Sequence, residues 1–413
     1  MMSLDSSVSK VFKKSIADGE LDVPSSKSWA NRMLILASLS RDEITLRNLP
    51  KSTDVINMIQ ALRKVGLEIE ELGPGEVKVK NSFPECELES EKIVSLETGD
   101  GGTTNRFLVP LLARGKNTYE IIPGGKLKER PQHELVDILK KLNVSVEEGL
   151  ASNPWWIRLK GPIESSLSKI EIDCKDSTQF ASAALMALWN SGVEIEYKNL
   201  ETSVRYLEMT EDLIKTFSSG ETEFAVPIDF SSAGYPIALG CLFGKVKIKN
   251  FYEIDTFQAD SKFIEILKSS GGRISENEGL LIEKSDLLGA SLDCSMFPDL
   301  VPTLAFVFAY ARGETRLRNI EVLIHKESNR LEEILTLFKL FEIEHKYDEA
   351  KDELLIVGRE TTISHEVEYK APDDHRMVMV GYLFMRFNAG GTLHNAVHVK
   401  KSFPNFFEVM ESL

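Results

Sequence analysis

Cationic and hydroxyl side chains gather where the hydropathy pattern predicts the beginning of a helix. Residues 24–28 read PSSKS and precede the apolar run 33–39, and Arg32 lies one turn beyond Ser28. The first backbone N–H groups of a helix are unpaired, so together with the charge of Lys27 they form a suitable place for an anion. For this segment taken alone, an ordinary helix cap with solvated cations is the alternative interpretation.

Polar segments at other predicted helix starts fit the same interpretation. Residues 99–106 (GDGGTTNR) carry three glycines that let a ligand approach the backbone, although no Lys-Ser/Thr pair of a Walker A loop follows. Residues 126–131 (KLKERP) concentrate cations before a helix expected to begin at Pro131. Residues 176–179 (DSTQ) open an apolar helix that continues to Leu188. The alternative interpretation is a tight structural turn for residues 99–106, a solvated charged loop for residues 126–131 and a simple helix cap for residues 176–179.

The second half of the chain adds carboxylates to the cations. Asp299 precedes the apolar run 300–311 and is either a helix cap or a general base. The run is shorter than the roughly 18 residues of a membrane span, so we interpret it as a buried helix. Residues 326–330 (KESNR), 374–377 (DHRM) and 400–404 (KKSFP) combine acids, cations and hydroxyls, and each could instead be a solvated face.

A repeated unit must position these segments. In it, an amphipathic helix precedes a strand, a polar turn and another strand; in the first copy the apolar positions 55, 58, 59 and 62 share one helical face. The repeated helices are expected to begin near residues 54, 131, 206, 260, 328 and 375. Such a helix cannot bury its apolar face alone, so six copies indicate two domains of three, with the middle boundary within 226–232. A generic α/β protein with similar helices is the alternative.

Composition restricts the class of protein. The 413 residues include 64 acidic and 49 basic side chains, and the net charge of −15 disfavours a general binder of nucleic acids or membrane surfaces. The four cysteines are widely spaced, which indicates neither a disulfide framework nor a zinc site and favours the cytoplasm. The N-terminal segment lacks the apolar core of a signal peptide. His394 and His398 lie in an expected strand and loop, so we predict no metal site.

Taken in order, these eight segments resemble the 3-phosphoshikimate 1-carboxyvinyltransferase (EPSP synthase) family, from Lys27 to Phe407. The resemblance implies an α/β (α+β) fold of two similar domains, each with three βαβαββ repeats, known as an inside-out α/β barrel. It implies an active site in the interdomain cleft. The expected domains are residues 23–228 and, discontinuously, residues 1–22 plus 229–413.

The resemblance also implies a reaction. Members of the family transfer the enolpyruvyl group of phosphoenolpyruvate to the 5-hydroxyl of shikimate 3-phosphate and release phosphate, in the chorismate pathway to the aromatic amino acids. The reaction passes through a tetrahedral intermediate and needs no metal or organic cofactor. Members of the family are usually monomers with two small-molecule substrates, and glyphosate is a candidate inhibitor. The missing signal peptide and the net charge of −15 predict separately a cytoplasmic protein with no nucleic-acid or membrane partner.

Two other functions compete with this interpretation. The related UDP-N-acetylglucosamine enolpyruvyltransferases carry a reactive cysteine in the loop corresponding to residues 123–131, where this chain has none. A non-catalytic paralogue that binds phosphorylated metabolites is the second alternative, suggested by Asp100 and Lys126. Turnover with one substrate pair or the other separates the three possibilities.

The resemblance assigns roles to individual residues. Asp299 is expected to accept the proton of the attacking hydroxyl, Glu327 to protonate the methylene carbon, and Lys27 and His375 to assist departure of phosphate. The residues expected at shikimate 3-phosphate are Lys27, Ser28, Arg32, Ser177, Thr178, Gln179, Ser203, Tyr206, Asp299 and Lys326. Those expected at phosphoenolpyruvate are Lys27, Gly102, Lys126, Gln179, Arg330, Arg376 and Lys401.

Several positions depart from the usual family pattern. Asp100 stands where Asn is usual, and its carboxylate would repel phosphoenolpyruvate unless it were paired or protonated. Lys126 stands where Arg is usual, which keeps the charge but loses bidentate geometry. Asn329 replaces the Asp of a Glu-Ser-Asp-Arg motif. These changes bear on affinity and leave the expected catalytic residues in place.

Overall fold

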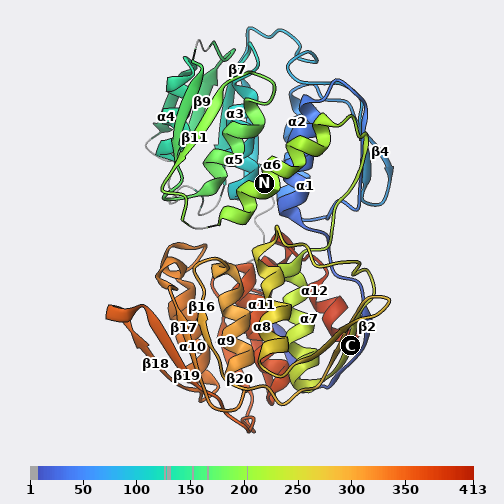
Figure 1. The fold of residues 1–413 in the computed structure, drawn as a ribbon, viewed down its shortest axis with the longest axis vertical. Coiled ribbons are helices and arrows are strands. Elements are labelled where there is room, and N and C mark those ends of the chain that lie inside the picture. The colour runs from blue at the N-terminus through green and yellow to red at the C-terminus, as the bar shows by residue number, and fades with distance from the viewer. Residues whose placement is uncertain (1–7, 125–126, 128–131, 151–152, 165–166, 202) are drawn as a thin grey trace. The chain divides into compact units, whose positions relative to one another are not determined.

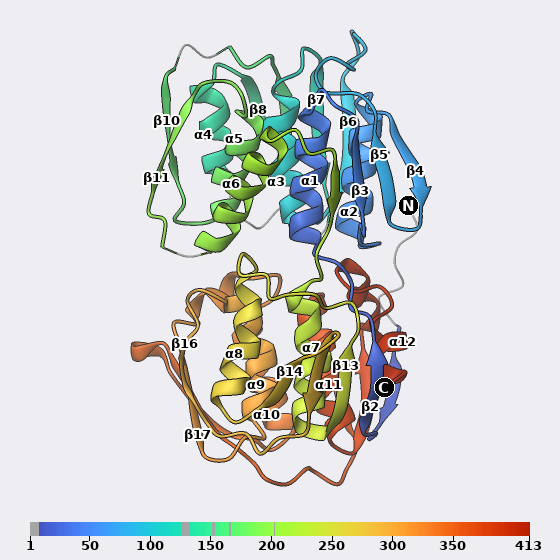
Figure 2. The same cartoon turned by 45° about the vertical axis from the view of Figure 1, so that its right-hand side comes forward.

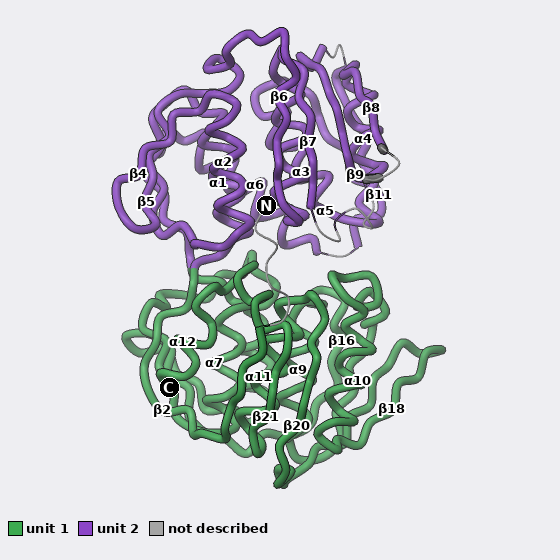
Figure 3. Tube along the Cα trace, turned by 180° about the vertical axis from the view of Figure 1, so that it is seen from behind, with its two compact units in different colours: residues 1–24, 228–413 green, residues 25–227 purple. Residues whose placement is uncertain are grey.

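The chain forms two compact units. The computed structural model describes residues 8–124, 127, 132–150, 153–164, 167–201 and 203–413. Residues 1–24 and 228–413 form unit 1, and residues 25–227 form unit 2 (Figure 3). Each unit has its own hydrophobic core. The sequence-based boundaries, 22/23 and 228/229, lie within two residues of these.

Unit 2 is built around three inner helices that pack against one another. These are α1 (Lys27–Leu39), α3 (Gly102–Leu112) and α5 (Thr178–Ala187). Their sequences are apolar on nearly every side, as expected for helices with no face toward solvent. The outer helices are amphipathic and bury one face only: α2 (Thr53–Lys64), α4 (His133–Lys141) and α6 (Val204–Ser218).

The described residues of unit 2 also form two four-stranded sheets and one strand pair. The first sheet has the order β12 (Glu223–Ala225), β3 (Ile44–Arg47), β5 (Glu76–Val79), β4 (Ile69–Gly73). The second has the order β6 (Val94–Gly99), β7 (Thr118–Pro123), β9 (Asn153–Lys160), β8 (Ser145–Leu150). In both, the first two strands are parallel and the last two form an antiparallel hairpin. β10 (Lys169–Asp173) pairs in parallel with β11 (Glu194–Lys198).

Unit 1 repeats this plan. Its inner helices are α7 (Phe230–Phe243), α9 (Val301–Phe308) and α11 (His375–Phe387), which contact one another and lie side by side in Figure 1. Its outer helices are α8 (Lys262–Ser269), α10 (Arg330–Leu340) and α12 (Phe406–Glu411). Short 3-10 turns link several elements: η2 (Ala259–Ser261), η3 (Pro298–Leu300), η4 (Glu321–His325), η5 (Glu349–Lys351) and η6 (Ala396–Lys401).

The sheets of unit 1 enclose these helices on the outside (Figure 2). One sheet has the order β14 (Arg273–Glu276), β15 (Leu280–Glu283), β13 (Gly244–Ile248), β2 (Ala17–Leu21). Another has the order β16 (Ser291–Asp293), β17 (Glu314–Arg318), β19 (Glu353–Val357), β18 (Glu344–Asp348). The third has the order β1 (Lys10–Lys13), β21 (Gly390–His394), β20 (Val367–Lys370). The same parallel pair and antiparallel hairpin recur in the two larger sheets.

A recurrent turn marks the repeat at the level of single residues. Asn48, Asn199, Asn319 and Asn395 each follow the second strand of a repeat directly, and each has a φ between 51° and 60°. Asparagine tolerates this left-handed conformation better than most residues. Together with the sheet order, this confirms the predicted α/β architecture of two similar domains built from βαβαββ repeats, the inside-out fold.

Most of the predicted helix starts are confirmed, and one was assigned to the wrong helix. α2, α6, α8 and α10 begin within two residues of the expected positions. α4 begins at His133, while the expected start at Pro131 lies outside the described residues. The prediction of another amphipathic copy near residue 375 is wrong, because α11 is an inner helix and is buried on nearly every side. The outer helix of that repeat is α12.

Candidate active site

The expected site residues of unit 2 lie at the N-terminal ends of helices. α1 begins at Lys27, α3 at Gly102 and α5 at Thr178. Ser177 caps α5, because its Oγ accepts a hydrogen bond from the Gln179 backbone N–H at 3.2 Å. Unpaired N–H groups and the helix dipole make each of these ends favourable to an anion.

Lys27 is held by a carboxylate that the sequence analysis did not identify. Its Nζ lies 3.0 Å from Oδ2 of Asp54, which is buried in the first turn of α2. The backbone oxygen of Asp54 accepts a hydrogen bond from Thr104 Oγ1 at 3.0 Å, which ties α2 to α3. A Cβ at Gly101 would come within 2.5 Å of Asp54 Oδ1, so a larger residue there would require the Asp54 side chain to shift.

Arg32 is buried and joins three helices. Its guanidinium donates to Thr210 Oγ1 at 2.7 Å, to the carbonyl of Ser28 at 2.9 Å and to the carbonyl of Tyr206 at 3.0 Å. All of these acceptors are neutral, and burial lowers the pKa of Arg32 to about 10. With a further hydrogen bond to Ser182 Oγ of α5 at 3.4 Å, these contacts connect α1 with α5 and α6 and fix the start of α1, where Ser28 lies.

Gln179 has its amide orientation set by a neighbouring arginine. Arg106 of α3 is buried and donates to Gln179 Oε1 at 2.9 Å and to Ser177 Oγ at 3.3 Å. The Nε2 group of Gln179 then faces Thr103 Oγ1 at 3.4 Å. Arg106 lies within a segment that the sequence analysis had singled out, but no role was assigned to it.

Other expected residues of unit 2 lie around the same helix ends. Thr178 Oγ1 donates to the carbonyl of Ser203 at 3.3 Å, so the start of α5 contacts the start of α6. Ser203 has a φ of 55°, a left-handed conformation that is strained for serine. Tyr206 follows in the first turn of α6. Lys126 lies outside the described residues.

In unit 1, Asp299 is surrounded by three cations. It lies in η3 directly before α9, and its oxygens are 2.9 Å from Arg330 Nη1, 3.3 Å from Lys326 Nζ and 3.2 Å from Arg376 Nη2. Burial raises the pKa of the Asp299 carboxyl, but the three cations outweigh it and hold this pKa well below its usual value. Asp299 is therefore a carboxylate here, and α9 begins without using it as a cap.

Arg330 is shared between Asp299 and a second acid. Its Nε donates to Asp374 Oδ2 at 2.8 Å, and both side chains are almost completely buried. Asp374 also caps α11, since its Oδ1 accepts a hydrogen bond from the Arg376 backbone N–H at 2.9 Å. One buried carboxylate thus positions the first residues of α10 and α11 together.

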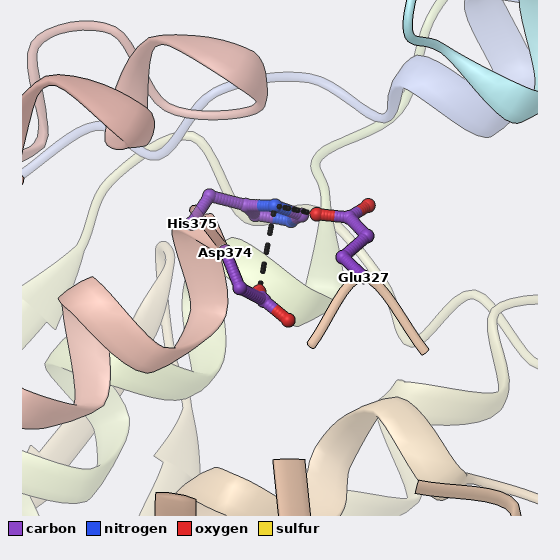
Figure 4. Close-up of side chains that lie close together, drawn as sticks. All are labelled: Glu327, Asp374 and His375. Carbon is purple, nitrogen blue, oxygen red and sulfur yellow. Dashed lines mark hydrogen bonds and ion pairs between the residues drawn. The ribbon is translucent and has the colours of Figure 1, made fainter. Parts of the chain in front are cut away.

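Glu327 lies between His375 and Lys401. Its Oε2 is 2.9 Å from His375 Nδ1 (Figure 4). Its Oε1 is 3.3 Å from Lys401 Nζ. Burial raises the pKa of Glu327, but the charges of His375 and Lys401 outweigh it and hold this pKa well below its usual value. Both carboxyls expected to move protons are therefore ionised and matched by cations.

Glu327, Asp374 and His375 also resemble a set of metal ligands, because one ligand atom of each lies within 4.8 Å of the others. Both carboxylates are already bound to cations: Glu327 to Lys401, and Asp374 to Arg330. In this structure both carboxylates are therefore engaged by side-chain cations of the chain itself. The two other histidines weighed as ligands pair with separate acids, His394 with Glu368 and His398 with Asp373.

The departure at Asn329 has a local explanation. Asn329 caps α10, because its Oδ1 accepts a hydrogen bond from the Glu332 backbone N–H at 3.2 Å. Asn and Asp are about equally good at this position of a helix. Asn329 therefore preserves the helix start that presents Arg330 to Asp299.

The Asp374 carboxylate leads to a prediction about stability. We expect Asp374→Asn to lower the free energy of unfolding by about 3 kcal/mol near pH 7, because it removes one partner of a buried ion pair. Although burial raises the pKa of Asp374, the charge of Arg330 outweighs it and lowers this pKa below its ordinary value of 3.8. The stabilisation is therefore present above pH 3.8 and is lost as the pH falls through the lower folded-state value.

Urea unfolding followed by circular dichroism at several pH values measures this difference. The matched control is Asp373→Asn, which changes a half-exposed neighbour paired with His398. A difference between Asp374→Asn and wild type that stayed constant down to pH 3 would contradict the electrostatic explanation.

Comparison with known proteins connects this arrangement to a family. Residues 12–410 match the sequence profile described as EPSP synthase (3-phosphoshikimate 1-carboxyvinyltransferase). The chain belongs to this family. A 3-phosphoshikimate 1-carboxyvinyltransferase of Thermococcus kodakarensis is 31% identical over 421 residues, which cover 96% of this chain and 97% of that relative. The resemblance to the EPSP synthase family inferred from the sequence is thereby confirmed.

Solved structures share the fold. An EPSP synthase from Acinetobacter baumannii has a TM-score of 0.81 at 20% identity, covering 98% of this chain and 97% of that one. The enolpyruvyl transferase NikO from Streptomyces tendae has a TM-score of 0.75 at 14% identity with the same coverage. Among the described residues, no helix combines the length and the hydrophobicity that crossing a bilayer requires.

Proposed function

We propose that this protein transfers the enolpyruvyl group of phosphoenolpyruvate to the 5-hydroxyl of shikimate 3-phosphate, as a member of the EPSP synthase family. The observation that carries the proposal is the pairing of its two candidate proton-transfer groups. Asp299 contacts Lys326, Arg330 and Arg376, and Glu327 contacts His375 and Lys401. An enzyme for two phosphorylated carboxylates needs such cations, and it needs acids beside them.

Substrate anions and protein carboxylates compete for these cations. When a phosphate or carboxylate group of a substrate binds Arg330, Arg376 or Lys401, it weakens the hold of that cation on Asp299 or Glu327. The pKa of each carboxyl then rises from its low value toward the range where it can exchange a proton. Binding of both substrates thus prepares the two acids for their roles.

The residues of unit 2 are assigned mainly to shikimate 3-phosphate. Lys27 and Ser28 at the start of α1, and Ser177, Thr178 and Gln179 at the start of α5, offer a cation, hydroxyls and an amide to its phosphate and carboxylate. Arg106 orients Gln179, and Asp54 orients Lys27. The remaining residues assigned to this ligand are Arg32, Ser203, Tyr206, Asp299 and Lys326.

The residues assigned to phosphoenolpyruvate include more cations than those assigned to shikimate 3-phosphate. Arg330, Arg376 and Lys401 would hold its phosphate and carboxylate groups, with Lys27, Gln179 and the backbone of Gly102 as further donors. Lys126, which lies outside the described residues, completes the set by resemblance. The cations are side chains of this chain, so the proposed steps require no metal or organic cofactor.

The bonds change in two steps. In the first, the 5-hydroxyl oxygen attacks C2 of phosphoenolpyruvate and its proton passes to Asp299, while Glu327 delivers a proton to C3. In the second, the tetrahedral adduct expels phosphate from C2, and the Glu327 carboxylate takes a proton back from the new methyl group, which restores the double bond. The proton held by Asp299 leaves with the phosphate, so both carboxyls return to their starting state. Lys27 and His375 are assigned to the departing phosphate, as cationic and hydrogen-bonding groups.

We further infer that the protein acts as a cytoplasmic monomer on diffusible metabolites. The net charge of −15 supports this, because it disfavours nucleic acids and membrane surfaces as partners. Glyphosate is a candidate inhibitor, since its phosphonate and carboxylate would compete for the cations assigned to phosphoenolpyruvate. Size-exclusion chromatography with light scattering tests the monomer.

Phosphate release tests the reaction. Purified protein receives phosphoenolpyruvate together with either shikimate 3-phosphate or UDP-N-acetylglucosamine. We expect release only with the shikimate ester. Release only with the nucleotide sugar would move the protein to the sister enzymes, and binding of both ligands without release would support a non-catalytic paralogue.

A further inference from the structure

We propose that Asp260 is a positioning residue that keeps Asp299 basic by sharing Arg376 with it. The inference rests on the proposed function, because Asp299 is its proton acceptor. Asp260 belongs to η2, ahead of α8, and its side chain is 2% exposed. It was not among the residues that the sequence analysis identified.

The contacts form a short chain from Asp260 to Asp299. Ser231, at the start of α7, donates its hydroxyl hydrogen to Asp260 Oδ2. Its oxygen accepts a hydrogen bond from Arg376 Nη2 at 3.1 Å. Arg376 Nη1 lies 3.8 Å from Asp260 Oδ2, and Nη2 lies 3.2 Å from Asp299 Oδ2. The Arg376 guanidinium therefore interacts with two carboxylates: that of Asp260, which is buried, and that of Asp299, which is partly exposed.

Removal of the charge on Asp260 lowers the proton affinity of Asp299 in two ways. Arg376 would turn wholly to Asp299 and bind it more tightly. The repulsion between the two carboxylates would also disappear. Both effects lower the proton affinity of Asp299, so the variant has a weaker general base. Loss of a negative charge next to Arg376 leaves binding of an anionic substrate unchanged or improves it.

If Asp260 only stabilised the fold, its replacement by asparagine would lower the melting temperature. Burial raises the pKa of Asp260 to about 6, with Asp299 and Asp229 contributing and Arg376 opposing. A carboxyl whose pKa is raised on folding contributes less stability as the pH rises through the folded-state value. Ionised Asp260 therefore opposes folding near pH 7, and a neutral side chain of the same shape should not lower the melting temperature.

The test compares Asp260→Asn with wild type in the complete enzyme, with Asp286→Asn, an exposed acid of the same unit, as control. We expect kcat to fall about tenfold, while KM for phosphoenolpyruvate does not rise and Tm does not fall. The ratio of wild-type to variant kcat should approach one as the pH is lowered from 8 to below 6, since Asp260 then becomes neutral in wild type. The groups that face it and could shift this midpoint are Arg376, Asp299, Asp229 and Ser231.

Two further variants separate this role from others. In an Asp299→Asn background, Asp260→Asn should cause no further loss of kcat, because it acts through Asp299. Ser231→Ala should lower kcat without raising KM, and it tests the proposal even if Asp260→Asn fails to fold. An unchanged kcat, or a raised KM together with a lowered Tm, would overturn the proposal.

A crystal structure of Asp260→Asn gives a readout that does not depend on turnover. We expect both Nη atoms of Arg376 to contact the Asp299 carboxylate, and an unmoved guanidinium would overturn the inference. If wild type itself fails to release phosphate from the two substrates, the proposed function is wrong. The crystal structure still shows whether Asp260 keeps part of the Arg376 guanidinium away from Asp299.

Discussion

Asp299→Asn is expected to lower kcat about 10²–10⁴-fold, the usual loss when a general base is removed. The amide has nearly the shape of the carboxyl group but cannot accept the proton of the attacking hydroxyl. Its loss also frees Lys326, Arg330 and Arg376 from a competing carboxylate, so both substrates should bind at least as tightly. A fall in kcat with unchanged or lower KM distinguishes this role from a binding role.

Steady-state kinetics with both substrates, with the melting temperature as a check on folding, provide the measurement. Asp293→Asn is a suitable control, because Asp293 is an exposed acid in the same unit. In wild type, the pH dependence of kcat should show an acid limb that the variant lacks. The midpoint of this limb should lie at a pH well above the low pKa of Asp299 in the free enzyme, since bound substrate anions draw the neighbouring cations away from Asp299. A kcat within threefold of wild type would assign the proton to another acceptor.

The repeat could be predicted because its outer helices are amphipathic. α2, α8 and α10 alternate between core and solvent with a period that a single sequence displays directly. The inner helices carry no such signal, because they are buried on nearly every side. For this reason the prediction for α11 as an outer helix is wrong. α12 is an outer helix, but its six residues are too few to show the period.

The helix starts that bear the candidate site were visible for a related reason. Polar residues directly before an apolar run have few structural explanations, and Lys27, Thr178 and His375 all begin helices in the structure. The assignment of roles to these residues came from the order of eight such segments and not from any one of them. Arg32 shows the limit of that approach, since its described contacts are internal to unit 2.

The partners of the charged residues could not be predicted. Asp54 pairs with Lys27, Asp374 with Arg330, and Asp260 with Arg376, across 27, 44 and 116 residues of sequence respectively. Each pair forms where two helix starts converge, which depends on the packing of the inner helices. A sequence shows which residues carry charge, whereas the pKa of each group depends on these tertiary neighbours.

Glu327→Gln is the second substitution with a large expected effect, about 10²–10⁴-fold on kcat. In the free protein Glu327 is ionised, held by His375 and Lys401, so it can protonate C3 only after gaining a proton. Binding of phosphoenolpyruvate to Lys401 weakens one of these contacts and raises the pKa of Glu327. Glutamine accepts similar hydrogen bonds but has no acidic proton to give.

Isotope exchange reports this step directly. If Glu327 protonates C3 reversibly, wild type in D₂O with both substrates should introduce deuterium into the methylene group of phosphoenolpyruvate, as followed by proton NMR. We expect Glu327→Gln to lose this exchange along with turnover, and Glu344→Gln, which changes an exposed acid of β18, to retain both. Exchange at the wild-type rate in Glu327→Gln would place the proton donor elsewhere, and His375, 2.9 Å from the same carboxylate, would be the next group to test.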